Sequence, residues 1–150
     1  MTLLNAELHI NVSILKENIC YLKTKIDKKS NFLAVVKANA YGHSLKKFVE
    51  KLDDCVDGYA LVRLDEALQV RDLSKKPILL MQGIYDDDEA LIAKRNGFMC
   101  VLHTQEQIRT YSRNLENKNI WLKVNTGMNR LGFSENVPVS YTHLRAHETF

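Results

Sequence analysis

Residues 32–44 read Phe-Leu-Ala-Val-Val-Lys-Ala-Asn-Ala-Tyr-Gly-His-Ser, and this stretch sets the fold that we expect. Its first five residues are an unbroken apolar run, the pattern of a strand that is buried on both faces of a parallel sheet. Lys37 follows at the carboxyl end of this strand, where barrels and open α/β sheets gather functional side chains. A lysine at this place can simply reach solvent, but lysine also forms Schiff bases with aldehydes. The residues around Lys37 therefore decide between the two interpretations.

Four more apolar runs follow along the chain, over residues 58–64, 78–81, 98–102 and 120–124. Amphipathic helical patterns lie between them, with apolar residues three and four positions apart. This alternation predicts about five βα units and a parallel sheet. It does not by itself separate a closed barrel from a doubly wound sheet. No Gly-x-Gly-x-x-Gly follows any strand, so the dinucleotide-binding fold loses its main sequence support.

Local signals add further expectations. Residues 6–10 could form a short strand, and Asn11 or Ser13 could cap the helix after it. Asp65 is placed to cap the helix that follows the second central strand. Residues 86–88 are three aspartates, and we interpret them as a solvated helix start rather than a metal site, because the helix dipole favours carboxylates there. The first helix is expected to bury one apolar face, formed by Leu15, Ile19, Leu22 and Ile26.

The composition is that of an ordinary globular domain. The chain has 150 residues, of which 45% are hydrophobic and 26% charged, and its net charge is +3. Without a basic block we expect no nucleic-acid partner, and without a leader or a long apolar run we expect a cytoplasmic protein with no membrane partner. Cys20, Cys55 and Cys100 lack metal-ligand spacing, so we expect no metal and three buried or half-buried free thiols.

A second informative stretch covers residues 121–133, which read Trp-Leu-Lys-Val-Asn-Thr-Gly-Met-Asn-Arg-Leu-Gly-Phe. It predicts a strand, then a polar turn, then Arg130. Because the strands are parallel, Arg130 and Lys37 are expected on the same rim of the sheet. The guanidinium of arginine matches a carboxylate, which suits an amino-acid substrate. A surface ion pair is the alternative role for this arginine.

Both stretches resemble segments of the alanine racemases, which are pyridoxal-phosphate enzymes of the barrel type. Residues 34–43 are similar to the family's cofactor-lysine segment, and residues 121–133 resemble its lysine, Asp-Thr-Gly-Met, arginine and Leu-Gly series. Ser44 stands where glycine is usual, and Asn125 where aspartate is usual. The likeness covers about residues 6–135 and includes Glu66. It implies a partial (β/α)8 TIM-type barrel, truncated because a complete barrel takes about 250 residues.

The resemblance implies a role for each marked residue. Lys37 would hold pyridoxal 5'-phosphate as an aldimine and exchange the substrate α-proton on one face. Tyr41 would contact the cofactor phosphate, and Arg130 would bind the substrate carboxylate and the cofactor ring oxygen. Lys123, carbamylated in some members, would support Arg130. For His43 and His103 we favour packing or supporting roles over proton transfer.

The expected parent protein is a homodimeric alanine racemase that interconverts L-alanine and D-alanine and supplies D-alanine for peptidoglycan. Residues 1–137 would be the amino-terminal part of its barrel, and residues 138–150 a non-native or disordered tail that resembles adapter read-through. The family's opposite-face base is a tyrosine from the partner's carboxyl-terminal domain, so we do not expect the isolated chain to racemise normally. Alternatives are a broad amino-acid racemase, a basic amino-acid decarboxylase, or an inactive cofactor-binding fragment.

Overall fold

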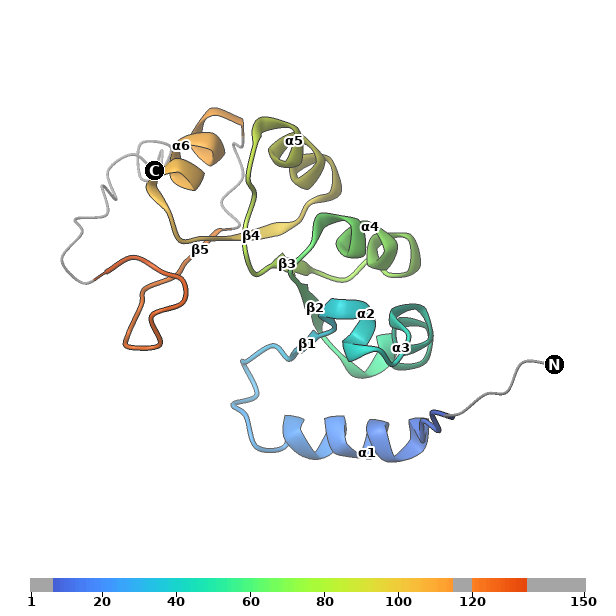
Figure 1. Ribbon diagram of the computed structural model, residues 1–150. Helices are drawn as coiled ribbons and strands as arrows, with labels where there is room; N and C mark the ends of the chain where they lie inside the picture. Colours follow the sequence, from blue (N-terminus) through green and yellow to red (C-terminus); the bar gives the residue numbers. More distant parts are fainter. Residues whose placement is uncertain (1–6, 115–119, 135–150) are drawn as a thin grey trace.

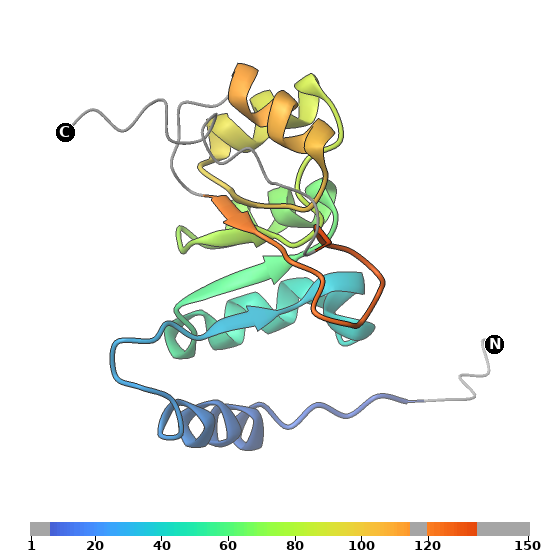
Figure 2. The same ribbon diagram turned by 90° about the vertical axis from the view of Figure 1, so that its left-hand side faces the viewer.

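The computed structural model describes residues 7–114 and 120–134, which form a parallel sheet with helices on one side (Figures 1 and 2). The sheet order follows the chain, and every neighbouring pair is parallel. A doubly wound sheet reverses its order, whereas a barrel wall does not. The predicted α/β fold, a partial barrel of about five βα units, is therefore confirmed. The strands are β1 (Leu33–Val35), β2 (Gly58–Leu61), β3 (Ile78–Leu80), β4 (Met99–Leu102) and β5 (Ile120–Leu122).

Helices α3 to α6 cover the outer face of the sheet, one after each of the first four strands (Figure 1). Helix α1 precedes the sheet and lies along its lower edge in that view, and α2 is a single turn after β1. The bounds are α1 (Val12–Lys23), α2 (Lys37–Tyr41), α3 (Leu45–Leu52), η1 (Asp53–Cys55), α4 (Leu64–Leu73), α5 (Asp87–Asn96) and α6 (Gln105–Asn114).

The two faces of the sheet carry different apolar clusters. The main core lies between strands and helices, and Tyr59 and Leu61 of β2 belong to it. The opposite face carries a smaller cluster centred on Ala60, Leu79 and Val101. At the sheet edges of the described chain this second face stays open, with Val35 43% and Trp121 51% exposed. Such a face is what a barrel wall presents to the strands that complete it.

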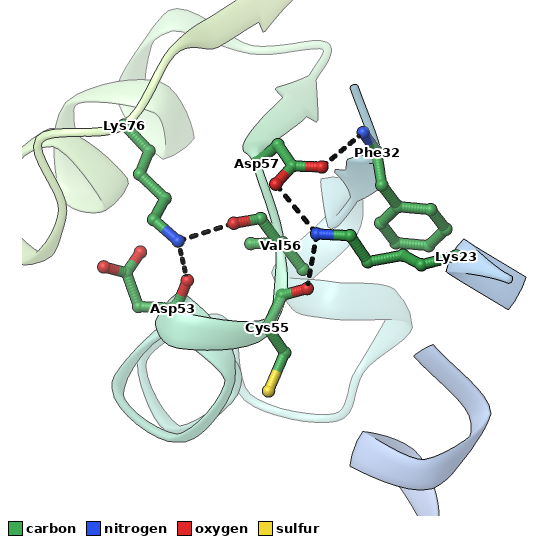
Figure 3. Close-up of polar contacts among 7 residues, drawn as sticks. All are labelled: Lys23, Phe32, Asp53, Cys55, Val56, Asp57 and Lys76. Atoms are coloured by element: carbon green, nitrogen blue, oxygen red, sulfur yellow. Dashed lines mark hydrogen bonds and ion pairs between the residues drawn. The ribbon is translucent and has the colours of Figure 1, made fainter. Parts of the chain in front are cut away.

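A polar network ties together the amino-terminal ends of the strands (Figure 3). Lys23 Nζ of α1 donates to Asp57 Oδ1 at 2.8 Å, and the backbone N–H of Phe32 donates to Asp57 Oδ2 at 2.7 Å. These two bonds hold the pKa of the Asp57 carboxyl below its usual value. Beside them, the Lys76 ammonium donates to the backbone carbonyls of Asp53 and Val56. In barrels this end of the strands contributes stability rather than catalysis.

Some local expectations are confirmed and others are wrong. Asn11 caps α1 by accepting from the N–H of Ile14 at 3.1 Å, and the aspartates at 86–88 do open α5. Residues 7–10 form no strand, because no described strand lies beside them. Asp65 is not a cap: α4 begins one residue earlier, and the Asp65 carboxylate pairs with the Arg63 guanidinium.

The predicted apolar face of the first helix is also only partly right. Ile19 is buried, but α1 ends before Ile26, and Leu22 is 48% exposed. All three cysteines are free, with Cys100 buried and Cys55 half-buried, but Cys20 is exposed rather than buried, because the buried position of α1 is its neighbour Ile19. The proposed tail, residues 138–150, lies outside the described residues.

Candidate functional site

Lys37 stands where the apolar strand β1 ends, at the carboxyl-terminal edge of the sheet. Its side chain is half-buried, and its ammonium lies 6.0 Å from the centre of the Tyr41 ring. Among residues 7–114 and 120–134 it has no hydrogen-bond or ion-pair partner. A lysine amine without a partner at a strand end is available to react with a ligand.

The turn that carries Lys37 out of the strand is left-handed. Ala38, Asn39, Ala40 and Tyr41 all have φ between 52° and 54°. This conformation costs side chains other than glycine roughly 1–2 kcal/mol per residue, and several in a row are rare. Two internal bonds close the turn, from the N–H of Ala40 to the carbonyl of Val36 and from the N–H of Gly42 to the carbonyl of Ala38, each 2.9 Å. Strain of this size persists only where surrounding groups hold it.

Three side chains supply that support. Glu66 of α4 accepts the N–H of Asn39 at 2.8 Å, across the gap between two βα units. The Asn39 side-chain oxygen accepts the N–H of Leu45, the first residue of α3, at 2.8 Å. His43 Nδ1 lies 3.1 Å from the carbonyl of Ala40 and 2.9 Å from that of Tyr41. Because both partners are acceptors, Nδ1 carries the proton in these contacts.

The loop after β5 carries Arg130 and is closed at its base by backbone pairing. The N–H of Asn125 donates to the carbonyl of Phe133 at 2.8 Å, and the N–H of Phe133 donates to the carbonyl of Lys123 at 2.9 Å. Gly132 has φ +121°, and a Cβ there would lie 2.6 Å from the Asn125 nitrogen. Only glycine lets the two backbone segments approach so closely. Arg130 is exposed on this loop and pairs with no other described residue.

Asn125 organises the interior of the same loop. Its side-chain oxygen accepts the N–H groups of Gly127 at 3.1 Å and Asn129 at 3.0 Å. Its side-chain amide donates to the Asn129 side-chain oxygen at 2.9 Å. The two accepted bonds need an oxygen but no charge, so they explain how asparagine can stand where aspartate is usual in the family. The amide adds a donor that aspartate lacks.

Lys123 and His103 lie together at the ends of β5 and β4. The N–H of Lys123 donates to the carbonyl of Leu102 at 2.9 Å, which prolongs the strand pairing. Burial, and then the nearby charge of Lys123, lower the pKa of His103. The buried His103 Nδ1 has no hydrogen-bond partner in the described chain. His103 is therefore a neutral neighbour of Lys123 at pH 7.

The structure brings some of the predicted residues together and leaves others apart. Lys37 and Tyr41 share one turn, and Lys123 and Arg130 share the loop after β5. These pairs occupy the two outer strands of the sheet, but both lie at the same end of the strands (Figure 2). In a closed barrel the first and fifth strands face each other across the mouth, so this arrangement suits one ligand between them.

Sequence reasoning missed the contacts that fix these loops. Glu66 drew attention only through its match to the family, and nothing in the sequence predicted that it meets Asn39. The signal available was a glutamate in the first turn of the helix after the neighbouring strand. Among the described residues no cluster of three metal-ligating side chains occurs. Within that same part of the chain, no helix has both the length and the apolar character to cross a bilayer.

Comparison with known proteins places this geometry in context. Residues 10–149 match the family described as "Alanine racemase, N-terminal domain". The curated alanine racemase of Mannheimia succiniciproducens is 43% identical over 143 residues, which are 93% of this chain but 40% of that protein. The chain thus spans well under half the length of this relative.

Solved structures agree with this similarity. The alanine racemase from Acinetobacter baumannii superposes with a TM-score of 0.74 at 32% identity, covering 83% of this chain and 36% of that one. An alanine racemase from Bartonella henselae with covalently bound pyridoxal phosphate gives 0.73 at 26%, covering 84% and 38%. A histidine racemase from Leuconostoc mesenteroides gives 0.71 at 29%, covering 82% and 34%.

Proposed function

Because this chain belongs to the alanine racemase family, we propose that it is the amino-terminal part of an enzyme that interconverts L-alanine and D-alanine with pyridoxal phosphate. The single observation that carries the proposal is Lys37, a half-buried amine without a polar partner in the described chain, at the mouth of a barrel wall. The covalent cofactor of the Bartonella henselae relative supports the same reading.

The residues present fit this cofactor in their chemistry. Lys37 offers an amine for the aldehyde, Tyr41 a hydroxyl for the phosphate, and Arg130 a guanidinium for a carboxylate. When bound, pyridoxal phosphate supplies an electron sink for the negative charge left on a substrate after loss of its α-proton. Tyr41 is 59% exposed, so its hydroxyl is open to a ligand.

Lys37, Arg130 and Lys123 would have different roles. Lys37 would hold the cofactor through its aldehyde, and its amine would serve as the group that removes or returns the α-proton on one face of the substrate. Arg130 binds the substrate carboxylate and so orients the α-carbon toward that amine. Lys123 supports Arg130 from the base of its loop.

The rest of the enzyme would supply what this chain lacks. Racemisation needs a second proton-transfer group on the opposite face, and the family resemblance assigns it to the partner of a homodimer. The resemblance also supports a cytoplasmic location and a role in supplying D-alanine for the cell wall. We further propose that residues 138–150 lie outside the domain, although the family match runs to residue 149. If this is right, deleting them from the 150-residue chain should leave its far-UV circular dichroism per folded residue and its protease-resistant core unchanged.

A second candidate is racemisation of a different amino acid. The histidine racemase of similar fold, at 29% identity, favours this alternative over a basic amino-acid decarboxylase. Substrate panels separate the candidates: D-product from alanine alone supports the main proposal, whereas D-histidine as the main product supports the alternative. Release of carbon dioxide would instead identify a decarboxylase.

The test is to trap the cofactor on the full-length protein that contains this chain. We expect pyridoxal phosphate and borohydride to label Lys37, and Lys37→Ala to abolish both the label and alanine racemisation. Lys46→Ala, an exposed lysine of α3, is the matched control and should keep both. Equal labelling of wild type and Lys37→Ala would overturn the assignment. Labelling without racemisation of any amino acid would leave a protein that binds the cofactor but is not an enzyme.

A further inference from the structure

Glu66 is a buried carboxylate in the helix beside the turn that carries Lys37. It lies in the first turn of α4, and its residue surface is 9% exposed. One oxygen, Oε1, accepts the N–H of Asn39 at 2.8 Å. The other, Oε2, is buried and has no hydrogen-bond partner in the described chain. Burying a carboxylate costs free energy unless hydrogen bonds or an opposite charge compensate for its lost hydration.

The bond reaches a strained part of the backbone. Asn39 has φ +54° and stands in the middle of the left-handed turn between Lys37 and Gly42. Its N–H points out of the turn, whereas the internal bonds join the residues on either side of it. Without the Glu66 carboxylate this N–H would have to bond to water. The turn would then have no hydrogen bond from Asn39 to the second βα unit.

Asn39 also links the turn to the next helix. Its side-chain oxygen accepts the N–H of Leu45 at the start of α3, where no side chain of the preceding residue caps the helix. Glu66, Asn39 and Leu45 therefore form a chain of hydrogen bonds from α4 through the turn to α3. Lys37 is the first residue of α2, so this chain of hydrogen bonds holds the backbone that follows it directly.

We propose that Glu66 is a positioning residue that holds the left-handed turn and thereby aims the Lys37 amine at the cofactor. This inference rests on the proposed function for the part that concerns the cofactor, but the hold on the turn is independent of it. What matters is the reach of the acceptor oxygen to the Asn39 N–H rather than the charge of the carboxylate. Glutamine keeps the oxygen at that reach, whereas aspartate keeps the charge but is one methylene shorter.

The experiment compares Glu66→Gln, Glu66→Asp and Glu66→Leu in the full-length protein by two measurements. The first is hydrogen exchange of the Asn39 amide without cofactor, and the second is the rate at which pyridoxal phosphate and borohydride label Lys37. Glu89→Ala is the matched control, because Glu89 likewise accepts a backbone N–H, that of Tyr85, at the start of α5. Cooperative melting is checked for every variant.

We expect the aspartate and leucine variants to lose at least about tenfold in Asn39 protection and in labelling rate, the change that corresponds to about 1.4 kcal/mol. The glutamine variant and the Glu89→Ala control should stay within about threefold of wild type in both. If the leucine variant does not melt cooperatively, the glutamine and aspartate variants decide.

Two results would overturn the inference. The first is that Glu66→Asp keeps the labelling of Lys37 while Glu66→Gln loses it, because the charge would then matter. The second is that the Asn39 amide is protected as in wild type in both Glu66→Asp and Glu66→Leu. If wild type itself takes no label on Lys37, the proposed function fails. Hydrogen exchange of the Asn39 amide then still tests whether Glu66 holds the turn. Loss of protection in Glu66→Asp but not in Glu66→Gln supports that role, and equal protection in the two variants refutes it.

Discussion

Replacing Gly132 by alanine should open the loop that carries Arg130, and Gly127→Ala provides the control. Both glycines have strongly positive φ, +121° and +126°, so alanine adds a similar backbone strain of about 1–3 kcal/mol at each. Their surroundings differ. A Cβ on Gly127 meets nothing within 4 Å, whereas a Cβ on Gly132 lies 2.6 Å from the nitrogen of Asn125 and 2.9 Å from the carbonyl carbon of Val124.

Relief of that contact requires the two backbone segments to separate, because neither atom belongs to a flexible side chain. Separation breaks the bonds from Asn125 to Phe133 and from Phe133 to Lys123. At about 0.5–1.5 kcal/mol each, Gly132→Ala should cost about 2 kcal/mol more than Gly127→Ala. This difference corresponds to roughly a thirtyfold larger population of the open loop.

The assay is hydrogen exchange of the Asn125 and Phe133 amides in the full-length protein. Exchange in Gly132→Ala should be faster than in Gly127→Ala by about that factor, while amides of β2 stay unchanged. If the full-length protein has the proposed racemase activity, its KM for alanine should rise more in Gly132→Ala, because Arg130 is no longer held in place. Equal exchange in the two variants would show that the loop accommodates the methyl group and would refute the steric argument.

Three further outcomes are expected. Asp57→Asn should lower the free energy of unfolding by about 1 kcal/mol at pH 7 in urea titrations, because the bonds from Lys23 and Phe32 lose their charged acceptor. The effect is no larger because the Asp57 side chain is 33% exposed and its charge is partly screened by water. Since the pKa of Asp57 is lowered on folding, this contribution is present above pH about 4 and is lost as the pH falls further, so an undiminished difference at pH 2 would contradict it. The pKa of His103 is lowered by burial and by Lys123, so its NMR titration midpoint should lie below 6.5. The free energy of unfolding should therefore fall as the pH drops below 6.5, because the folded state binds the proton less readily than the unfolded chain. A midpoint at or above 6.5 would disprove the burial argument. The isolated 150-residue chain should self-associate through the open apolar face of its sheet, and a monodisperse, cooperatively melting monomer on sizing and calorimetry would count against this.

The sequence predicted the sheet well because buried parallel strands are marked by continuous apolar runs. The apolar runs placed Lys37 directly after β1 and Arg130 in the loop after β5, and parallel pairing put that turn and that loop at the same end of the strands. The prediction of a strand over residues 6–10 failed because a short apolar alternation needs a neighbouring strand to pair with, and the described chain offers none there. Similarly, the periodicity of the first helix ran past its end because Ile26 follows a turn that begins at Thr24.

The parts of the site that could not be predicted are those that depend on contacts between distant residues. Nothing local marks Ala38 to Tyr41 as left-handed, since alanine favours right-handed helices. The contact that ties this turn to the second βα unit comes from Glu66, which is far along the chain from Asn39. Position 132 could not be predicted for the same reason, because it requires glycine only through its close approach to the backbone of Asn125 across the loop.

The two candidate loops share one physical design, although they lie on opposite edges of the sheet. In each, the cation itself has no polar partner within the described chain, and an asparagine beside it bonds backbone N–H groups: Asn39 caps α3, and Asn125 holds Gly127 and Asn129. Backbone with positive φ stores strain in both loops, and neighbouring groups hold it in place. An arrangement that fixes the backbone but leaves the ammonium or guanidinium unpaired is suited to ligand binding, since the ordering of the loop is completed on folding rather than on binding. For Lys37 and Arg130 this arrangement supports the proposed roles in binding the cofactor and the substrate, in contrast to Lys23, whose ammonium is paired with Asp57 within the fold.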